Sequence, residues 1–168
     1  SDVVTSTASI VSPTYSTSNN LNAGSYAQNA SGLGGADAGN YTLTAFTTPT
    51  NNYTVTQLAL TGTAIAASNS AYGSPLNPGA VSFGNVQGMD VVTSTASVNT
   101  ATLSSSGNPI AGSYTQTAGA LSGTDAGNYS FGGYTTPTAN YTINPLALTV
   151  TSIAAVNTTY GTPAPTGA

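Results

Sequence analysis

Apolar and hydroxyl side chains alternate along several short stretches of the chain. Val92, Ala96 and Val98 fall on one face of the segment 92–98, while Thr and Ser fill the other face. The segment 141–143 alternates in the same way. A period of two residues is typical of β-strands that bury one face and expose the other. We therefore expect β-strands in both segments.

Turn-forming residues separate the alternating stretches. Gly, Ser, Pro, Asn and Ala cluster at 73–75, 77–79, 107–109 and 126–128. Such clusters mark turns, because Gly and Asn tolerate left-handed backbone and Pro fixes its own φ. Short strands separated in this way predict an all-β fold made of small β-sandwich (Ig-like) domains, with a β-grasp-like domain as the alternative.

The chain repeats itself with a period of 88 residues. Residues 2–9 read Asp-Val-Val-Thr-Ser-Thr-Ala-Ser and recur unchanged at 90–97. Residues 37–41 recur unchanged at 125–129, and about 46 of the 80 aligned positions are identical without a gap. This period exceeds the roughly 20–45 residues of a solenoid repeat. We interpret it as a string of small domains.

The boundary between units is marked by Asn144-Pro145, after which the segment Leu-Ala-Leu-Thr begins. Placing the boundary there gives one complete repeat unit at 58–145. Residues 1–57 are then the C-terminal part of a preceding unit, and residues 146–168 are the N-terminal strands of the next unit.

The two incomplete units are complementary in sequence. Leu146, Leu148 and Val150 continue the alternation beyond the proline and predict the opening strand of a unit. Left alone, this strand and the 1–57 body would expose apolar faces and unpaired edges, which recruit partner strands. We therefore expect 146–168 of one copy to pack into the 1–57 body of a neighbouring copy, either in one continuous chain or by strand exchange.

Charged residues are almost absent. The 168 residues include four Asp and no Lys, Arg, His or Cys, so the net charge is −4. Without basic side chains the chain cannot neutralise phosphates, which argues against nucleic-acid binding and against anchoring to anionic lipid. Membrane insertion is not expected either, because no apolar run approaches the roughly 20 residues of a spanning helix. The absence of Cys excludes disulfides.

Catalysis is not expected. A hydroxyl nucleophile needs an activating base, and neither His nor Lys is present. The four carboxylates occupy repeat-equivalent positions rather than one cluster: Asp2, Asp37, Asp90 and Asp125. Asp125 and Asn128 could supply some ligands to calcium, but we favour a turn held by their side chains. We expect no metal site and no cofactor.

The order of the motifs resembles a known family. Segments 146–151 and 160–163 look like the opening of a unit, 88–92, 111–114 and 121–129 like its middle, and 139–145 like its end. Together they resemble the YDG and MBG-type repeats of filamentous-haemagglutinin-like bacterial adhesins. The resemblance implies secretion across a Gram-negative outer membrane, long surface fibres, and a role in attachment or biofilm. The Lys often seen near the unit junction of that family is absent.

Acceptor sequences for N-glycosylation occur at six positions, where Asn is followed two residues later by Ser or Thr. They are Asn29, Asn40, Asn52, Asn128, Asn140 and Asn157. Some adhesins related to this family carry sugars at such positions. The alternative is that a chain rich in Asn and Thr contains these triplets by chance.

Tyrosines recur in register in the two copies, as Tyr41 with Tyr129 and Tyr53 with Tyr141. Because aromatic rings also bind sugars, a repeated carbohydrate-binding module for host or matrix glycans is one reading. Packing of the rings in the core with the hydroxyl at the rim is favoured, since these Tyr lie inside strand-like runs. The sequence thus predicts a structural segment of a bacterial extracellular fibre or adhesin stalk, assembling head to tail at the cell surface.

Overall fold

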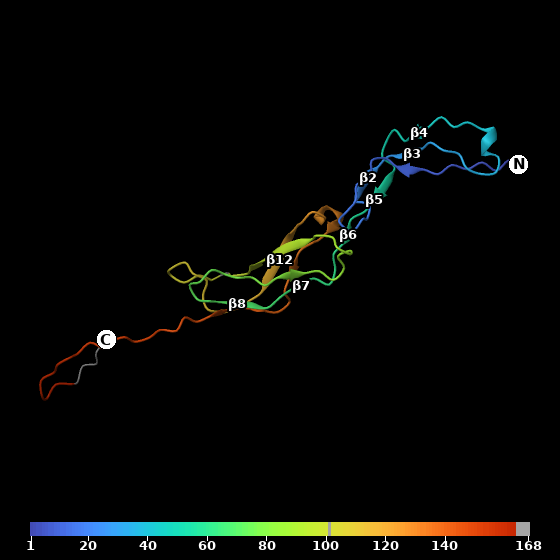
Figure 1. Ribbon diagram of the computed structural model, residues 1–168. Coiled ribbons are helices and arrows are strands. Elements are labelled where there is room, and N and C mark those ends of the chain that lie inside the picture. Colours follow the sequence, from blue (N-terminus) through green and yellow to red (C-terminus); the bar gives the residue numbers. More distant parts are fainter. Residues whose placement is uncertain (101, 164–168) are drawn as a thin grey trace.

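The computed structural model describes residues 1–100 and 102–163, in which the regular elements are short β-strands (Figure 1). The only helices in these ranges are two single 3₁₀ turns, η1 (Ala38–Asn40) and η2 (Ala126–Asn128). The prediction of an all-β fold is confirmed. None of the helical turns in the described part of the chain is long and apolar enough to cross a membrane.

The segment 58–145 folds around two three-stranded sheets. One has the antiparallel order β10–β12–β14, and the other has the order β11–β15–β8, in which β15 pairs with β8 in parallel. The two-stranded pairs β7–β9 and β6–β13 complete the strand pairing of this segment. The strands are β6 (Leu58–Ala59), β7 (Ala64–Ile65), β8 (Ser68–Ala71), β9 (Val81–Ser82), β10 (Thr93–Val98), β11 (Gly112–Tyr114), β12 (Gln116–Ser122), β13 (Tyr129–Ser130), β14 (Tyr134–Thr135) and β15 (Tyr141–Asn144).

The segment 1–57 contains the sheet β1–β3–β4 and the pair β2–β5. Its strands are β1 (Ser9–Ile10), β2 (Gly24–Tyr26), β3 (Gln28–Ala30), β4 (Phe46–Thr47) and β5 (Tyr53–Val55). Each pairing recurs 88 residues later in the same register. For example, Tyr26 faces Tyr53 in the first half, and Tyr114 faces Tyr141 in the second. The two halves therefore share strand pairing as well as sequence.

Only the 58–145 half has a hydrophobic core. Tyr141 is fully buried, whereas its counterpart Tyr53 is 41% exposed. Tyr129 is 3% exposed, whereas Tyr41 is 49% exposed. In 58–145 the segment that carries β6 to β9 lies against these side chains, and no described segment plays that role for 1–57.

The strand predictions hold inside the 58–145 half. Along β10 the exposure alternates: Ser94, Ala96 and Val98 are half-buried, and the residues between them are exposed. Along β15, Tyr141 and Ile143 are buried and the intervening residues are exposed.

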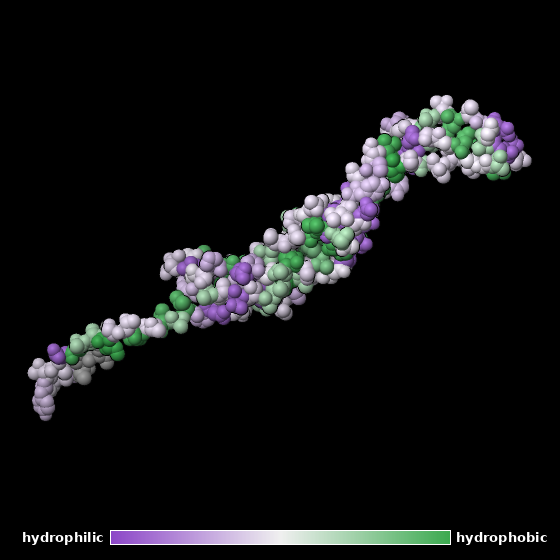
Figure 2. All heavy atoms as spheres, viewed as in Figure 1, coloured by the Kyte–Doolittle hydropathy of each residue, from purple (hydrophilic) through white to green (hydrophobic). Residues whose placement is uncertain are grey.

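The strand expected at the start of 146–168 remains a prediction, because it was expected to form against a neighbouring copy and the structure contains one copy. The described part, 146–163, forms no strand and extends away from the sheets (Figure 1). Leu146, Leu148 and Val150 are 58%, 90% and 82% exposed, and hydrophobic side chains line this extension in Figure 2. The reason is physical: a strand needs a hydrogen-bonding neighbour, and none lies beside this segment.

Three of the four predicted turns are present. Ser74 N–H donates to Ala71, Gly107 N–H to Ser104, and Asn128 N–H to Asp125.

The segment 77–79 is not the turn that its Asn-Pro-Gly sequence predicts. Gly79 instead crosses the backbone of Ala66 so closely that an added Cβ would overlap the Ala66 carbonyl. Glycine here permits a close approach of two segments rather than a reversal of direction.

The molecule is elongated, with the two halves in a row and the N-terminus and the 146–163 segment at opposite ends (Figure 1). Its accessible surface is 11000 Å². A compact protein of this mass would expose about 7,500 Å². The excess comes from the open first half and the bare C-terminal segment.

Candidate functional site

A tight hairpin projects from each half at the same place in the repeat. In the first, which we call hairpin 15–21, Tyr15 bridges Leu21 and Asn19 has a φ of 64°. In the second, hairpin 103–109, Leu103 bridges Pro109. There Gly107 takes the left-handed position with a φ of 80°. Asn and Gly are the residues that adopt this backbone at least cost, so the same turn is encoded twice with different residues.

Hairpin 15–21 docks on two carboxylates of the 58–145 half. The backbone N–H of Thr17 donates to Asp125 Oδ1 at 3.0 Å, and its hydroxyl donates to Oδ2 at 2.7 Å. The backbone N–H of Ser18 donates to Asp90 Oδ1 at 2.9 Å. Hydrogen bonds to an ionised acceptor are roughly twice as strong as neutral ones. Two carboxylates therefore hold the tip of the hairpin.

The loop before Asp90 closes over the same tip. The Ser18 hydroxyl donates to the Gln87 carbonyl at 2.8 Å and accepts from Met89 N–H at 2.7 Å. Between them, Gly88 has a φ of 50°, and a Cβ there would lie 2.7 Å from the Ser18 Oγ. Only glycine fits this contact without displacement.

A third polar side chain fixes the base of the hairpin. Asn128 Oδ1 accepts from Ala23 N–H at 2.7 Å, and its Nδ2 donates to Asn22 Oδ1 at 3.0 Å. Nearby, Gln57 Nε2 donates to the Gly127 carbonyl at 2.9 Å. We call the docking of hairpin 15–21 and residues 22–23 on Asp90, Asp125 and Asn128 the internal joint.

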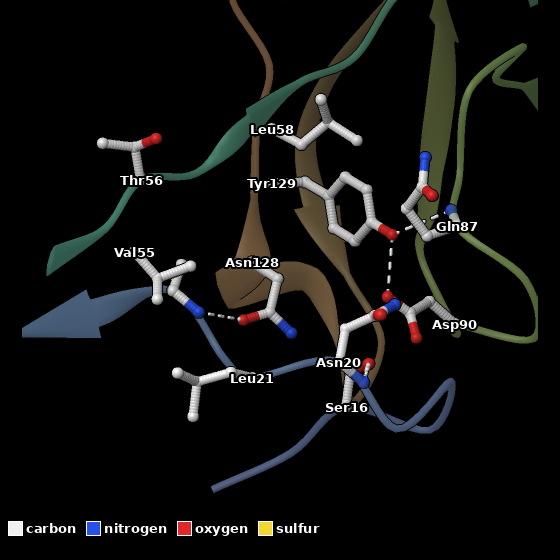
Figure 3. A pocket seen from close by; sticks show the side chains of 11 residues that line it. Ser16, Asn20, Leu21, Val55, Thr56, Leu58, Gln87, Asp90, Asn128 and Tyr129 are labelled. Carbon is white, nitrogen blue, oxygen red and sulfur yellow. Dashed lines mark hydrogen bonds between the residues drawn. The ribbon is translucent and has the colours of Figure 1, made fainter. Parts of the chain in front are cut away.

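Tyr129 fixes one of the two carboxylates of the joint through a hydrogen bond. Its hydroxyl donates to Asp90 Oδ2 at 2.7 Å and accepts from Gln87 N–H at 2.9 Å (Figure 3). A cavity of about 170 Å³ lies beside it, lined by residues of both halves, including Leu21 and Leu58.

Hydrogen bonding sets the protonation of the carboxylate that holds Thr17. The pKa of Asp125 is lowered, first by the backbone N–H of Val91 and then by the hydroxyl and N–H of Thr17. The ionised form is therefore the one that the joint binds.

Burial and hydrogen bonding shift the pKa of the second carboxylate, Asp90, in opposite directions. Burial acts to raise the pKa of Asp90, but hydrogen bonds from Tyr129, Ser18 and Ser16 outweigh it, so the pKa is lowered. Burial is also the main reason that the pKa of Tyr129 is raised.

The joint corrects the interpretation of Asp125 and Asn128 as turn-stabilising residues. Asp125 makes no side-chain bond to the η2 turn, and the Asn128 side chain bonds to residues 22 and 23. Among the described residues there is no group of three or more His, Cys, Asp or Glu placed to hold a metal ion.

The six glycosylation candidates differ in accessibility. Asn128 and Asn140 are half-buried, and Asn140 Nδ2 donates to the Ile65 carbonyl at 2.9 Å. A sugar on either amide would break such contacts. Asn29 is also half-buried, and its amide donates to Thr47 at 2.8 Å. The exposed candidates are Asn40, Asn52 and Asn157.

Two tyrosines of the 58–145 half are poor candidates for sugar binding. Tyr141 and Tyr129 are buried and their hydroxyls accept backbone N–H groups, so neither presents a ring face to solvent. This agrees with core packing. Their counterparts Tyr41 and Tyr53 are exposed because nothing covers the first half.

The sequence identified Asp90 and Asp125 as the repeat counterparts of Asp2 and Asp37. It did not predict that hairpin 15–21 binds Asp90 and Asp125. A signal was present, because Asn19 and Gly107 lie at the same repeat position inside Ser-rich segments. Asn and Gly at one position indicate left-handed backbone in a turn. No pattern along the chain, however, points from the hairpin to the carboxylates.

No protein-family model, curated protein or solved structure matches this chain. The resemblance to adhesin repeats therefore rests on the motifs alone.

Proposed function

We propose that this chain is a structural tandem-repeat segment of a bacterial extracellular fibre or adhesin stalk, in which copies join head to tail and each complete unit is a small β-sandwich. One observation carries the proposal. The 1–57 half has the strand pairing of a complete unit without its cover, while 146–163 has the sequence of that cover and lies bare at the other end of the molecule.

The complementarity extends to individual strands. In the complete unit, β8 pairs in parallel with β15. Residues 156–159 are the repeat counterpart of β8, and β5 is the repeat counterpart of β15. Residues 156–159 of one copy can therefore pair with β5 of the next copy. An unpaired edge and an unpaired segment of matching sequence stabilise each other when they meet.

Burial of side chains favours the same assembly. Ile65 of β7 is 6% exposed inside the complete unit, whereas the corresponding Ile153 is 74% exposed. Burying a Leu, Ile or Val side chain contributes about 1.5–3 kcal/mol. The bare segment carries several such side chains, so its docking on a second copy has a favourable driving force.

The extracellular location and the adhesin class depend on the sequence rather than on geometry. The motif resemblance supports them, and the absence of Lys, Arg and Cys is compatible with a bacterial surface fibre. A repeated carbohydrate-binding module remains the alternative, and glycan-array binding by the isolated chain would favour it over a stalk.

Sedimentation velocity of the full chain over a range of concentrations tests the assembly, with negative-stain microscopy of the same samples. We expect concentration-dependent growth into thin filaments. A variant carrying Leu148→Ser and Val150→Ser should stay monomeric, while the matched control Thr149→Ser and Thr151→Ser should assemble like the parent chain. A chain that remains monomeric at every concentration would contradict the proposal.

A further inference from the structure

The N-terminal end of the molecule repeats the carboxylate arrangement of the internal joint. Tyr41 OH donates to Asp2 Oδ2 at 2.8 Å, as Tyr129 OH donates to Asp90 Oδ2 at 2.7 Å. The backbone N–H of Val3 donates to Asp37 Oδ2 at 2.7 Å, and Val91 N–H makes the matching bond to Asp125 at 2.8 Å.

The two sites differ in what lies against them. Asp125 also receives the N–H and hydroxyl of Thr17, and these hydrogen bonds have no counterpart at Asp37 in the described residues. Asn40, the counterpart of the half-buried Asn128, is exposed. The carboxylates are thus held in the binding arrangement with their hairpin-facing side open.

The matching hairpin lies toward the other end of the molecule. Hairpin 103–109 is closed by a bond from Ser104 N–H to the Asn108 carbonyl at 2.8 Å, as Ser16 N–H bonds to Asn20 at 2.9 Å in hairpin 15–21. In Figure 1 it is the yellow loop that projects beyond β8. The Tyr72 hydroxyl donates to the Ser104 hydroxyl at 2.8 Å and braces it.

The tip of this hairpin carries the donors that the carboxylates bind. Thr17 corresponds to Ser105, and Ser18 corresponds to Ser106, so a hydroxyl and a backbone N–H are present at both positions. Ser105 and Ser106 are both exposed. The chain therefore presents one free hairpin and one free carboxylate pair.

We propose that Asp2, Asp37 and Asn40 of one copy bind hairpin 103–109 of a second copy, reproducing the internal joint between molecules. This inference rests on the proposed head-to-tail assembly and deepens it by naming the contact that sets register. The Ser105 hydroxyl and N–H donate to Asp37, the Ser106 N–H donates to Asp2, and Ala111 N–H donates to Asn40 Oδ1.

The contact is compatible with the strand docking described above. At the internal joint, one hairpin docks at the place where the chain passes from 57 to 58, beside β6. The equivalent place at the other end is the passage from 145 to 146. A second copy bound by hairpin 103–109 is therefore positioned to receive 146–163 on its open 1–57 half. Because the contact joins unlike ends and does not close, it propagates as a filament.

A charge introduced at the tip tests the contact. Ser105→Asp places a carboxylate against Asp37 of the second copy, and Asp37→Lys removes the acceptor. Each variant alone should weaken self-association measured by sedimentation by at least about tenfold, because like charges face each other or donors lose their partner. Thr95→Asp, an equal charge change on the exposed side of β10, is the matched control and should assemble normally.

Mixing the two variants gives the decisive result. In the mixture, the unaltered hairpin of the Asp37→Lys chain meets the unaltered carboxylates of the Ser105→Asp chain, and the altered pair brings Asp against Lys. We expect assembly to return when the two are combined. If the parent chain assembles but both variants assemble equally well alone, the hairpin contact is wrong and the proposed assembly stands. If the parent chain does not assemble, the proposed function itself fails.

Discussion

Residues at equivalent positions of the repeat have different neighbours in the two halves, and their contributions to stability differ for that reason. Gln116 is fully buried, and its Oε1 accepts from Gly79 N–H at 2.7 Å. Its Nε2 donates to the carbonyl of Ala66 at 3.1 Å and to Asn140 Oδ1 at 2.8 Å. Its counterpart Gln28 is half-buried and bonds through Nε2 to Asn52 alone. A fully bonded buried amide ties the segment 66–79 to β12.

Replacing this amide should therefore destabilise the 58–145 half, whereas replacing its counterpart should cost little. Gln116→Met leaves a buried N–H and two buried oxygens without partners, and we expect a loss of about 2–4 kcal/mol in the free energy of unfolding. Gln28→Met is the matched control and should cost less than about 1 kcal/mol. Urea denaturation of both variants measures the difference. Equal losses in the two variants would contradict the role of the Gln116 amide in holding the segment 66–79 against β12.

Acid should weaken the internal joint. The folded-state pKa values of Asp90 and Asp125 lie below the ordinary value of 3.8, so both bind protons less readily when folded. Their contribution to stability is then complete above the ordinary pKa, and it is lost as pH falls through the lowered values. We expect amide hydrogen exchange at Thr17 and Ser18 to be constant from about pH 7 to 5, after correction for intrinsic rates, and to accelerate below about pH 4.

Asp125→Asn provides the check on that pH dependence, because its side chain cannot ionise. Thr17 should then be less protected at neutral pH, and protection there should change less on acidification. Protection that increases as the parent chain is acidified would contradict the assignment.

At the scale of elements, the short strands carry few hydrogen bonds each, and the hairpins add the contacts that join them. Hairpin 15–21 and residues 22–23 cross from one half to the other and meet two segments, residues 87–90 and 125–128. The fit depends on the backbone of Gly88, which lets the Ser18 side chain approach.

Gly88→Ala should push this hairpin outward. The substitution combines a positive φ with a Cβ that would meet the Ser18 hydroxyl, so we expect about 1–2 kcal/mol of destabilisation at the joint. Gly127→Ala is the control, because its Cβ would meet nothing within 4 Å and its φ is not in the left-handed region. Amide chemical shifts of Ser18 and Met89 report the displacement. Unchanged shifts in Gly88→Ala would show that the hairpin does not need this glycine.

At the scale of the whole molecule, the buried core and the surfaces of the proposed assembly belong to different parts of the chain. Among the described residues, the buried hydrophobic side chains all lie within 58–145, whereas the open faces lie in 1–57 and 146–163. In the proposed head-to-tail assembly, the open faces at the two ends of this elongated molecule would be buried against neighbouring copies.

Removal of residues 146–168 should therefore leave the monomer as stable as before. The described part of this segment forms no strand, and its apolar side chains are exposed, so we expect the melting temperature of a dilute sample to change by less than about 2 °C. Thermal unfolding followed by circular dichroism measures it. A large fall would mean that the segment packs on its own 58–145 unit.

The sequence by itself determined the all-β character, the 88-residue period and the alternation of β10 and β15, because these depend on residues close together in the chain. Side-chain period and turn chemistry are local properties, and they survive in the fold. The division at 58 and 146 remains a prediction.

Only the tertiary structure decided the rest. Thr17 meets Asp125 across 108 positions, and Ser18 meets Asp90 across 72. No local pattern encodes such contacts, since they depend on where two complete strand arrangements lie in space. The segment 77–79 became a close crossing rather than a turn for the same reason. Leu146, Leu148 and Val150 have the alternation of a strand, but a strand also requires a hydrogen-bonding neighbour, and the fold of a single copy provides none beside them.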